Sequence, residues 1–186
     1  MKYVSLDLET TSLDPSPSHI LMVSMVVEDT KNILPLEQLP HFTCFVRPDG
    51  PIVGAPMALW MNGWILKLLA EKEPKAPFPI YNENDWWILA NDFITHHFGY
   101  GVKTVAAGKN VAGFDLKFLP ERVKERFHHR VIDPGSMFLD WALDEVPPDS
   151  KLCKERAGLE GIVTHNAYED AIDIIRILRT RYVSRV

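Results

Sequence analysis

The feature that most constrains the fold is a series of three strand-like segments in the first quarter of the chain. They cover residues 2–8 (KYVSLDL), 20–27 (ILMVSMVV) and 42–46 (FTCFV). Apolar residues with strand propensity dominate each segment, and Pro48, Asp49 and Gly50 stop the third. Because the connections are short and rich in turn residues, the segments are predicted to form an antiparallel meander.

The pattern changes after residue 50, where helices begin to alternate with strands. Helices are predicted over 56–70, 84–98, 114–127 (interrupted at Pro120), 149–157 and 167–182, strands over 102–106 and 131–132, and a Pro-rich loop over 74–79. This order predicts an α/β fold, a three-layer sandwich with a mixed five-stranded sheet flanked by helices. It resembles the ribonuclease-H-like arrangement, which implies a central position for the first strand. A chain of 186 residues with 46% hydrophobic residues is expected to form a single domain over 1–186.

Charge and cysteine content narrow the range of partners and compartments. The formal net charge is −5, whereas proteins that grip long duplexes usually carry a basic excess. If nucleic acid is the substrate, a short segment or a single 3′ end is therefore easier to reconcile with this charge than a long duplex. No apolar run reaches the length of a membrane span, and no signal peptide is visible, so we expect a cytoplasmic protein. Cys44 and Cys153 are expected to be free thiols.

Two carboxylates stand together on the first predicted strand. Asp7 and Glu9 are two residues apart, so they point to one face while Leu6 and Leu8 point to the other. Neighbouring carboxylates repel each other, and a bound divalent cation would remove that penalty. A solvated strand end remains the alternative interpretation of this pair.

The last predicted helix carries a further acidic residue on its apolar side. Asn166 and Glu169 form a capping-box pattern, which places the first turn of the helix at Ala167. Asp170 then falls within the apolar arc of the helix, whereas Asp173 falls nearer the polar face. A carboxylate that faces a core needs a partner, which would be a metal ion or a hydrogen-bond donor. His165 precedes the helix and is expected in a loop beside Asp170.

A fourth carboxylate, Asp115, follows a predicted strand end and a glycine-containing turn. Strand-to-helix junctions lie at the edge of the sheet where α/β proteins commonly form their sites. Asp115 is also a favourable residue for the N-cap of the helix that follows, and the sequence leaves both interpretations open.

Together, these segments resemble the DnaQ-like (DEDDh) exonuclease superfamily. The first motif of that family is matched by residues 7–14 (DLETTSLD), the second by Asn110 with Phe114-Asp115, and the third by residues 165–171 (HNAYEDA). The order and separation of the motifs also agree, and a histidine five residues before the last Asp is typical of the DEDDh branch. The chain departs from the family at Ser12, where glycine is usual.

The resemblance implies a metal-dependent 3′→5′ exonuclease that hydrolyses single-stranded DNA or RNA to nucleoside 5′-monophosphates. Two Mg²⁺ or Mn²⁺ ions would be held by Asp7, Glu9, Asp115 and Asp170, with His165 as the general base. The residues expected to contact substrate are Thr10, Thr11, Leu13, Trp60 and Asn110. A homodimer is also an expectation, because related oligoribonucleases are often dimers.

Two other functions remain open at this stage. One is a non-catalytic nucleic-acid-binding or accessory module that retains the fold, and the other is a ribonuclease-H-like nuclease that cuts internally. Preference for DNA or RNA depends on contacts to the 2′-hydroxyl, to which the sequence assigns no residue.

Overall fold

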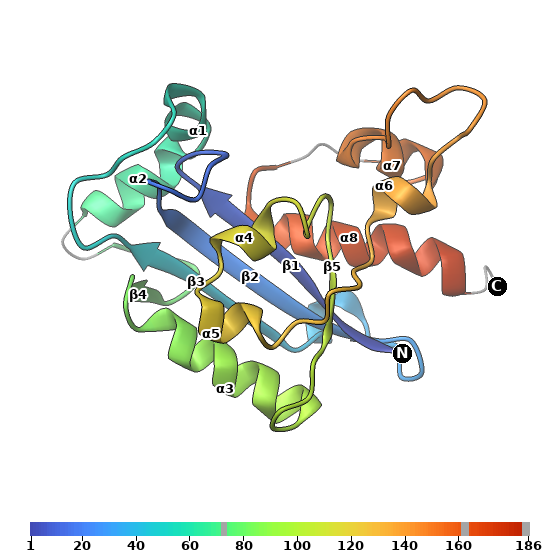
Figure 1. Cartoon of the computed structure of the whole chain (residues 1–186), viewed down its shortest axis with the longest axis horizontal. Coiled ribbons are helices and arrows are strands. Elements are labelled where there is room, and N and C mark those ends of the chain that lie inside the picture. Colours follow the sequence, from blue (N-terminus) through green and yellow to red (C-terminus); the bar gives the residue numbers. More distant parts are fainter. Residues whose placement is uncertain (72–73, 161–163, 184–186) are drawn as a thin grey trace.

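Three antiparallel strands form the body of the sheet, as the sequence predicts. They are β1 (Lys2–Thr10), β2 (Ile20–Asp29) and β3 (His41–Arg47). In the computed structural model, which describes residues 1–71, 74–160 and 164–183, these strands pair in the order β3-β2-β1 (Figure 1). Asp7 lies opposite Ser24 and Glu9 opposite Met22, and the register shifts between Glu9 and Thr10. The meander thus runs without interruption to the acidic end of β1.

Two short parallel strands complete a mixed five-stranded sheet in the order β4-β3-β2-β1-β5. They are β4 (Ile80–Asn82), which pairs with β3, and β5 (Val105–Ala107), which pairs with β1. The predicted class of sheet is confirmed, but one strand was predicted in the wrong place. Ile132 makes only an isolated bridge to Ala107, and β4 supplies the fifth strand. Three residues are too few to show the alternation of a strand, so β4 could not be predicted from periodicity.

The position of β1 also differs from the prediction. It is an interior strand between β2 and β5, but the middle strand of the sheet is β2. The reason is that β4 adds to the β3 edge, while the expected strand at residues 131–132 is not continuous enough to extend the other edge.

Helices cover both faces of the sheet, which gives the predicted three layers (Figure 1). On one face, α3 (Trp86–Phe98) buries Trp86, Ala90 and Ile94 against side chains of β1, β2 and β3. On the other face lie α2 (Gly63–Ala70) and α8 (Ala167–Tyr182). The α8 helix begins at the predicted residue because the Asn166 side chain accepts hydrogen bonds from the backbone N–H groups of Tyr168 and Glu169.

The helix predicted over 56–70 is two helices, α1 (Pro56–Met61) and α2, which meet at Asn62. Asn62 and Gly63 are poor helix formers, so a break here costs little. The buried Asn62 side chain donates to the carbonyl oxygen of Thr10 at 3.0 Å. This bond attaches the break to the end of β1 and brings α1 beside Asp7 and Glu9.

The remaining elements are short. They are a 3-10 turn, η1 (Leu36–Gln38), and the helices α4 (Asp115–Phe118), α5 (Glu121–Lys124), α6 (Pro134–Met137) and α7 (Ser150–Arg156). The helical segment predicted over 114–127 is thus divided at Pro120, while α6 was not predicted. Both Cys44 and Cys153 are buried free thiols, as expected. Among the described helices, none has the length and apolar character required to cross a membrane.

A buried ion pair fastens α8 to the sheet. Glu28 at the end of β2 is fully buried, and its Oε2 accepts from Arg179 Nε at 2.8 Å and from Arg179 Nη2 at 2.5 Å. Arg179 also donates to the carbonyl oxygen of Leu34. Near the other end of the contact, Ser5 Oγ donates to the carbonyl oxygen of Ala171 at 2.7 Å. Because Asp170 lies on α8, these contacts also set its position relative to β1.

We expect Arg179→Met to destabilise the protein by about 3–5 kcal/mol, because it leaves the Glu28 carboxylate buried without its cation. Chemical denaturation measures the free energy of unfolding. The free energy of unfolding should fall clearly less in the double variant Glu28→Met/Arg179→Met than in Arg179→Met. Lys151→Met, on the exposed side of α7, is the control and should be as stable as wild type. A single variant as stable as wild type would contradict this role of the pair.

Candidate active site

The acidic end of β1 presents two carboxylates on the face that α8 covers. Tyr3 on this face packs against α8, whereas Leu6 and Leu8 pack in the core on the α3 side. Asp7 is half-buried and Glu9 is buried, so neither stands at an open, solvated strand end. The structure therefore disagrees with the interpretation of this pair as ordinary surface residues.

The start of α8 brings Asp170 to the same place. Asp170 is half-buried, and its Oδ1 accepts weak hydrogen bonds from the backbone N–H and the hydroxyl of Thr164, at 3.5 and 3.4 Å. His165 lies between this contact and the helix cap, exposed and with a φ of 51°. A positive φ is uncommon outside glycine, but histidine, like asparagine and aspartate, adopts it more often than other residues do.

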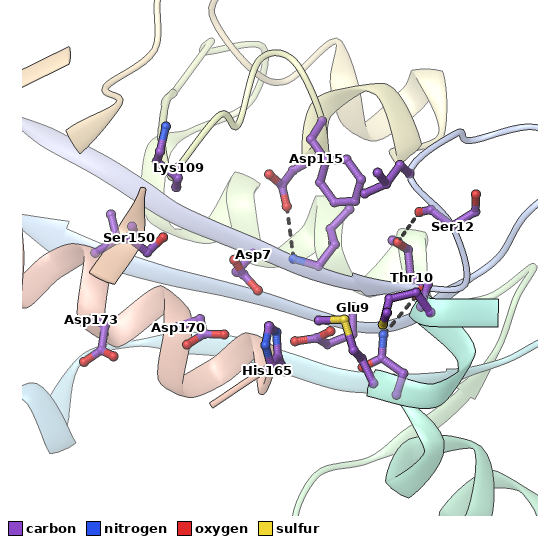
Figure 2. A pocket seen from close by; sticks show the side chains of 18 of the residues that line it. Asp7, Glu9, Thr10, Ser12, Lys109, Asp115, Ser150, His165, Asp170 and Asp173 are labelled. Atoms are coloured by element: carbon purple, nitrogen blue, oxygen red, sulfur yellow. Dashed lines mark hydrogen bonds between the residues drawn. The ribbon is translucent and has the colours of Figure 1, made fainter. Parts of the chain in front are cut away.

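Asp115 approaches β1 from the opposite side. It is 3% exposed, and its Oδ1 accepts a hydrogen bond from the backbone N–H of Leu8 at 3.1 Å. Phe114 occupies the N-cap position of α4, so Asp115 is not the cap. Figure 2 shows the Asp7 carboxylate between Asp115 on one side and Asp170 with His165 on the other. The tertiary structure thus gathers the four carboxylates and the histidine to which the family resemblance assigns metal binding and catalysis.

Burial and mutual repulsion make these carboxylates hard to ionise. Burial raises the pKa of Asp7 well above its ordinary value, and the charges of Asp115, Asp170 and Glu9 raise it further. Burial raises the pKa of Glu9 to about 7 and that of Asp115 to about 8, the latter opposed by backbone hydrogen bonds. The pKa of Asp170 is raised mainly by burial.

The arrangement fits a hard divalent cation. Asp7, Glu9 and Asp170 each offer one carboxylate oxygen, and these three atoms lie within 4.8 Å of one another. A purely oxygen donor set is the one that Mg²⁺ and Mn²⁺ prefer. A cation would also offset the repulsion that raises the pKa values, so the residues present are suited to the metal that the sequence motifs imply.

The carboxylates lie on the wall of a cavity of about 510 Å³. One end is largely apolar, with walls from the segment after β1 and from α1. The other end carries polar and charged side chains from the loop after β5, from α7 and from α8. The residues of the first end are Thr10, Ser12, Leu13, Ala55, Met57, Ala58, Met61 and Asn62, and those of the second are Lys109, Ser150, Lys154, Asp173, Ile174 and Ile177.

The residues predicted to contact substrate divide into two groups. Thr10 and Leu13 line the cavity, and Leu13 is 83% exposed. Thr11 is fully buried, and its hydroxyl donates to the Val53 carbonyl oxygen at 2.6 Å, so it secures the neighbouring loop and does not belong to the cavity wall.

Trp60 and Asn110 are likewise outside the cavity wall. Trp60 is 78% exposed on α1, so it could meet only a strand that extends beyond the cavity. The Asn110 side chain lies against Gly113, because a Cβ added to Gly113 would be 2.2 Å from Asn110 Oδ1. The backbone N–H of Asn110 donates a hydrogen bond to Asp133 Oδ2. Asn110 therefore shapes the turn that presents Asp115.

Several residues of this cavity were not predicted from the sequence, and one of its residues, Asp173, was predicted on the wrong face of its helix. Asp173 was assigned to the polar face of its helix, but it is only 9% exposed and pairs with Lys154 and Arg176. The helix predicted over 149–157 is observed as α7, but helical periodicity could not show that α7 packs Lys154 against that face. The break at Asn62 was detectable in principle from the Asn-Gly pair.

No family model matches the chain, and no curated protein matches its sequence. Solved structures do match its fold. Escherichia coli exonuclease I in complex with a dT13 oligonucleotide aligns with a TM-score of 0.63 at 18% identity, over 97% of this chain and 41% of that chain. The zinc-bound form of the E. coli exonuclease I–single-stranded DNA complex gives 0.62 at 18%, over 97% and 41%. Cell-death related nuclease 4 gives 0.65 at 14%, over 97% and 62%.

These identities are low, so the likeness establishes the fold. The predicted ribonuclease-H-like α/β class is confirmed, and the chain shares its fold with nucleases. It spans about two fifths of the length of exonuclease I and about three fifths of that of cell-death related nuclease 4.

We expect the stability of the metal-free protein to fall as pH rises from about 4 to about 8. In this window the raised pKa values let the folded state bind more protons than the unfolded chain, and each added unit of pH therefore favours unfolding. Thermal unfolding in chelator measures the trend, and Mn²⁺ should raise the melting temperature more at pH 8 than at pH 5. Asp7→Asn should weaken the pH dependence of the melting temperature, both in chelator and in Mn²⁺. If the pH dependence in this variant equals that of wild type, the carboxylate cluster is not its cause.

Proposed function

We propose that this chain is a metal-dependent 3′→5′ exonuclease that acts on single-stranded nucleic acid. The observation that carries the proposal is the convergence of the Asp7, Glu9 and Asp170 carboxylate oxygens within 4.8 Å on the wall of a 510 Å³ cavity. Asp115 and His165 line the same cavity. Four acids and a histidine in one cleft, with an apolar compartment beside them, suit hydrolysis of a phosphodiester better than binding of an anionic strand alone.

Asp7, Glu9, Asp115 and Asp170 would hold two Mg²⁺ or Mn²⁺ ions. When bound, such ions neutralise the charge that develops on the phosphate and on the leaving oxygen, and make the attacking water more acidic. Without cations the four carboxylates would repel the phosphate, so substrate binding depends on the same residues that hold the metal.

The remaining roles belong to side chains around the carboxylates. His165 would take the proton from the attacking water, for which its exposed position at the cavity and its imidazole chemistry are suitable. Thr164, through its contacts with Asp170, keeps His165 beside the acids. The apolar end, with Leu13, Met57 and Met61, would take the base of the 3′-terminal nucleotide.

The structural relatives support a single-stranded substrate. Exonuclease I shares the fold, and it has been crystallised with dT13 and with dA16 oligonucleotides. The base compartment offers mainly aliphatic and thioether groups, which do not distinguish bases by hydrogen bonds. We therefore expect little dependence on the identity of the terminal base, and a nucleoside 5′-monophosphate as the product.

We expect the protein to shorten 5′-labelled single-stranded oligomers from the 3′ end in Mn²⁺ or Mg²⁺, and to do nothing in chelator. Parallel DNA and RNA oligomers establish which sugar is preferred. Asp7→Asn, which keeps the side-chain shape but removes a charge, should be inactive. Cleavage of a circular single strand would identify an internal nuclease instead, and binding without cleavage under any metal would favour a non-catalytic module.

His165→Asn should lower turnover by about 10²–10⁴-fold, the usual contribution of a general base. Asparagine tolerates the left-handed backbone at this position, so the loop is preserved while the base is lost. The increase in melting temperature caused by Mn²⁺ should stay close to that of wild type. Turnover equal to wild type in His165→Asn would exclude this role for the histidine.

A further inference from the structure

The polar end of the cavity is not accounted for by the metal ligands or by the base compartment. Lys109 comes from the loop between β5 and α4, and Ser150 and Lys154 come from α7. These segments lie far apart in the sequence, yet all three residues line the cavity that Asp7 and Asp170 also line. Figure 2 shows Lys109 and Ser150 on one side of the carboxylates, and Thr10 and Ser12 on the other.

Lys109 carries a charge that its neighbour neutralises only weakly. Its Nζ lies 3.9 Å from Asp133 Oδ1, which is a long ion pair, and within the described part of the chain no hydrogen bond to this ammonium is found. Asp133 uses its oxygens elsewhere, since Oδ1 accepts from the Gly135 N–H at 2.7 Å and Oδ2 from the Asn110 N–H at 2.9 Å. The ammonium of Lys109 therefore retains donors that a ligand in the cavity could use.

The absence of a side chain at Gly135 allows the Lys109 ammonium to lie close to the backbone of residue 135. A Cβ at residue 135 would lie 2.8 Å from Lys109 Nζ, so the ammonium rests directly above this backbone. Asp133 caps the turn that carries Gly135. The position of the Lys109 ammonium at the cavity is thus determined by a turn of the chain and not by free rotation on an open surface.

Lys154 gives the same end of the cavity a second positive group. It is 4% exposed and forms an ion pair with Asp173, whose other oxygen accepts from Arg176 Nη1 at 2.9 Å. One carboxylate is therefore shared by two cations, and the three side chains form the Lys154–Asp173–Arg176 group. Together with Lys109, this group makes the polar end attractive to an anion, whereas the neighbouring carboxylates attract cations.

We propose that the Lys109 end of the cavity is a subsite for the phosphate on the 5′ side of the scissile linkage. The inference rests on the proposed function, which places the terminal base at the apolar end and the scissile phosphate at the carboxylates. The next phosphate of the strand then falls on the lysine side. Lys109 donates to that phosphate, Ser150 offers a hydroxyl, and the Lys154 group supplies background positive charge.

The subsite makes the protein sensitive to a phosphate that does not react. A dinucleotide without a 5′-phosphate fills the base compartment and the carboxylate centre but leaves the Lys109 end empty. Adding a 5′-phosphate to the same dinucleotide supplies the missing anion. A charge-assisted hydrogen bond at this site should favour the phosphorylated form on the order of tenfold.

The test compares dTpdT with 5′-phosphorylated pdTpdT. We expect kcat/KM of the wild-type protein in Mn²⁺ to be on the order of tenfold higher for pdTpdT. In Lys109→Ala the ratio of the two kcat/KM values should fall to about one, and Lys109→Arg should restore most of it. Lys117→Ala is the matched control, because Lys117 is exposed on α4 and does not line the cavity, so its ratio should equal that of wild type.

Calorimetric binding of both dinucleotides in Ca²⁺ separates this inference from the proposed function. Suppose that pdTpdT binds more tightly than dTpdT in Ca²⁺, that this difference disappears in Lys109→Ala, and that neither dinucleotide is cleaved in Mn²⁺. This outcome would support the subsite while the exonuclease proposal fails. Cleavage of both dinucleotides at equal rates, or a preference for pdTpdT that persists in Lys109→Ala, would overturn the subsite and leave the exonuclease proposal standing. Neither cleavage nor a difference in binding would overturn both.

Discussion

Four carboxylates lie together at the end of β1, and their mutual repulsion must be offset by the packing of the elements that carry them. Asp7, Glu9, Asp115 and Asp170 come from three distant parts of the chain, and isolated burial of any one would be unfavourable. The fold must hold these groups together against their repulsion. It does so with a strand inside the sheet, a helix pinned by the buried Glu28–Arg179 pair, and a turn bonded to the Leu8 backbone.

The same constraint explains how the cavity is divided. Charge of one sign at the centre favours a bound cation, and in the proposed function the phosphate is held there through that cation. The two ends of the cavity lie away from this centre, and they differ in the polarity of the side chains that line them. One is apolar because α1 presents Met57, Ala58 and Met61 to it, and the other is polar because Lys109, Lys154 and Asp173 line it. A nucleotide chain has the same alternation of apolar base and anionic linkage.

Much of the fold was predictable because its signals are local. The three long strands and the start of α8 were identified from runs of apolar residues and from the cap at Asn166, and the structure confirms them. The errors occur where a local signal was too short or was overruled. The β4 segment, at 80–82, is too short to be recognised as a strand from its sequence. The helix predicted over 56–70 breaks at Asn62, whose side-chain amide donates a hydrogen bond to the carbonyl oxygen of Thr10, 52 positions away. Thr11 belongs to a predicted motif, yet its hydroxyl holds a neighbouring loop.

The amino-acid sequence was enough to predict the chemical types and their approximate places: two acids on one face of β1, an acid inside the apolar arc of α8, and another after β5. These follow from strand and helix periodicity, which depends on neighbours within a few residues. The convergence of Asp7, Glu9 and Asp170, the burial of Asp173 beside Lys154 and the position of Lys109 at the same cavity became visible in three dimensions alone. Such proximity arises from the packing of segments far apart in the chain, and local periodicity carries no information about it.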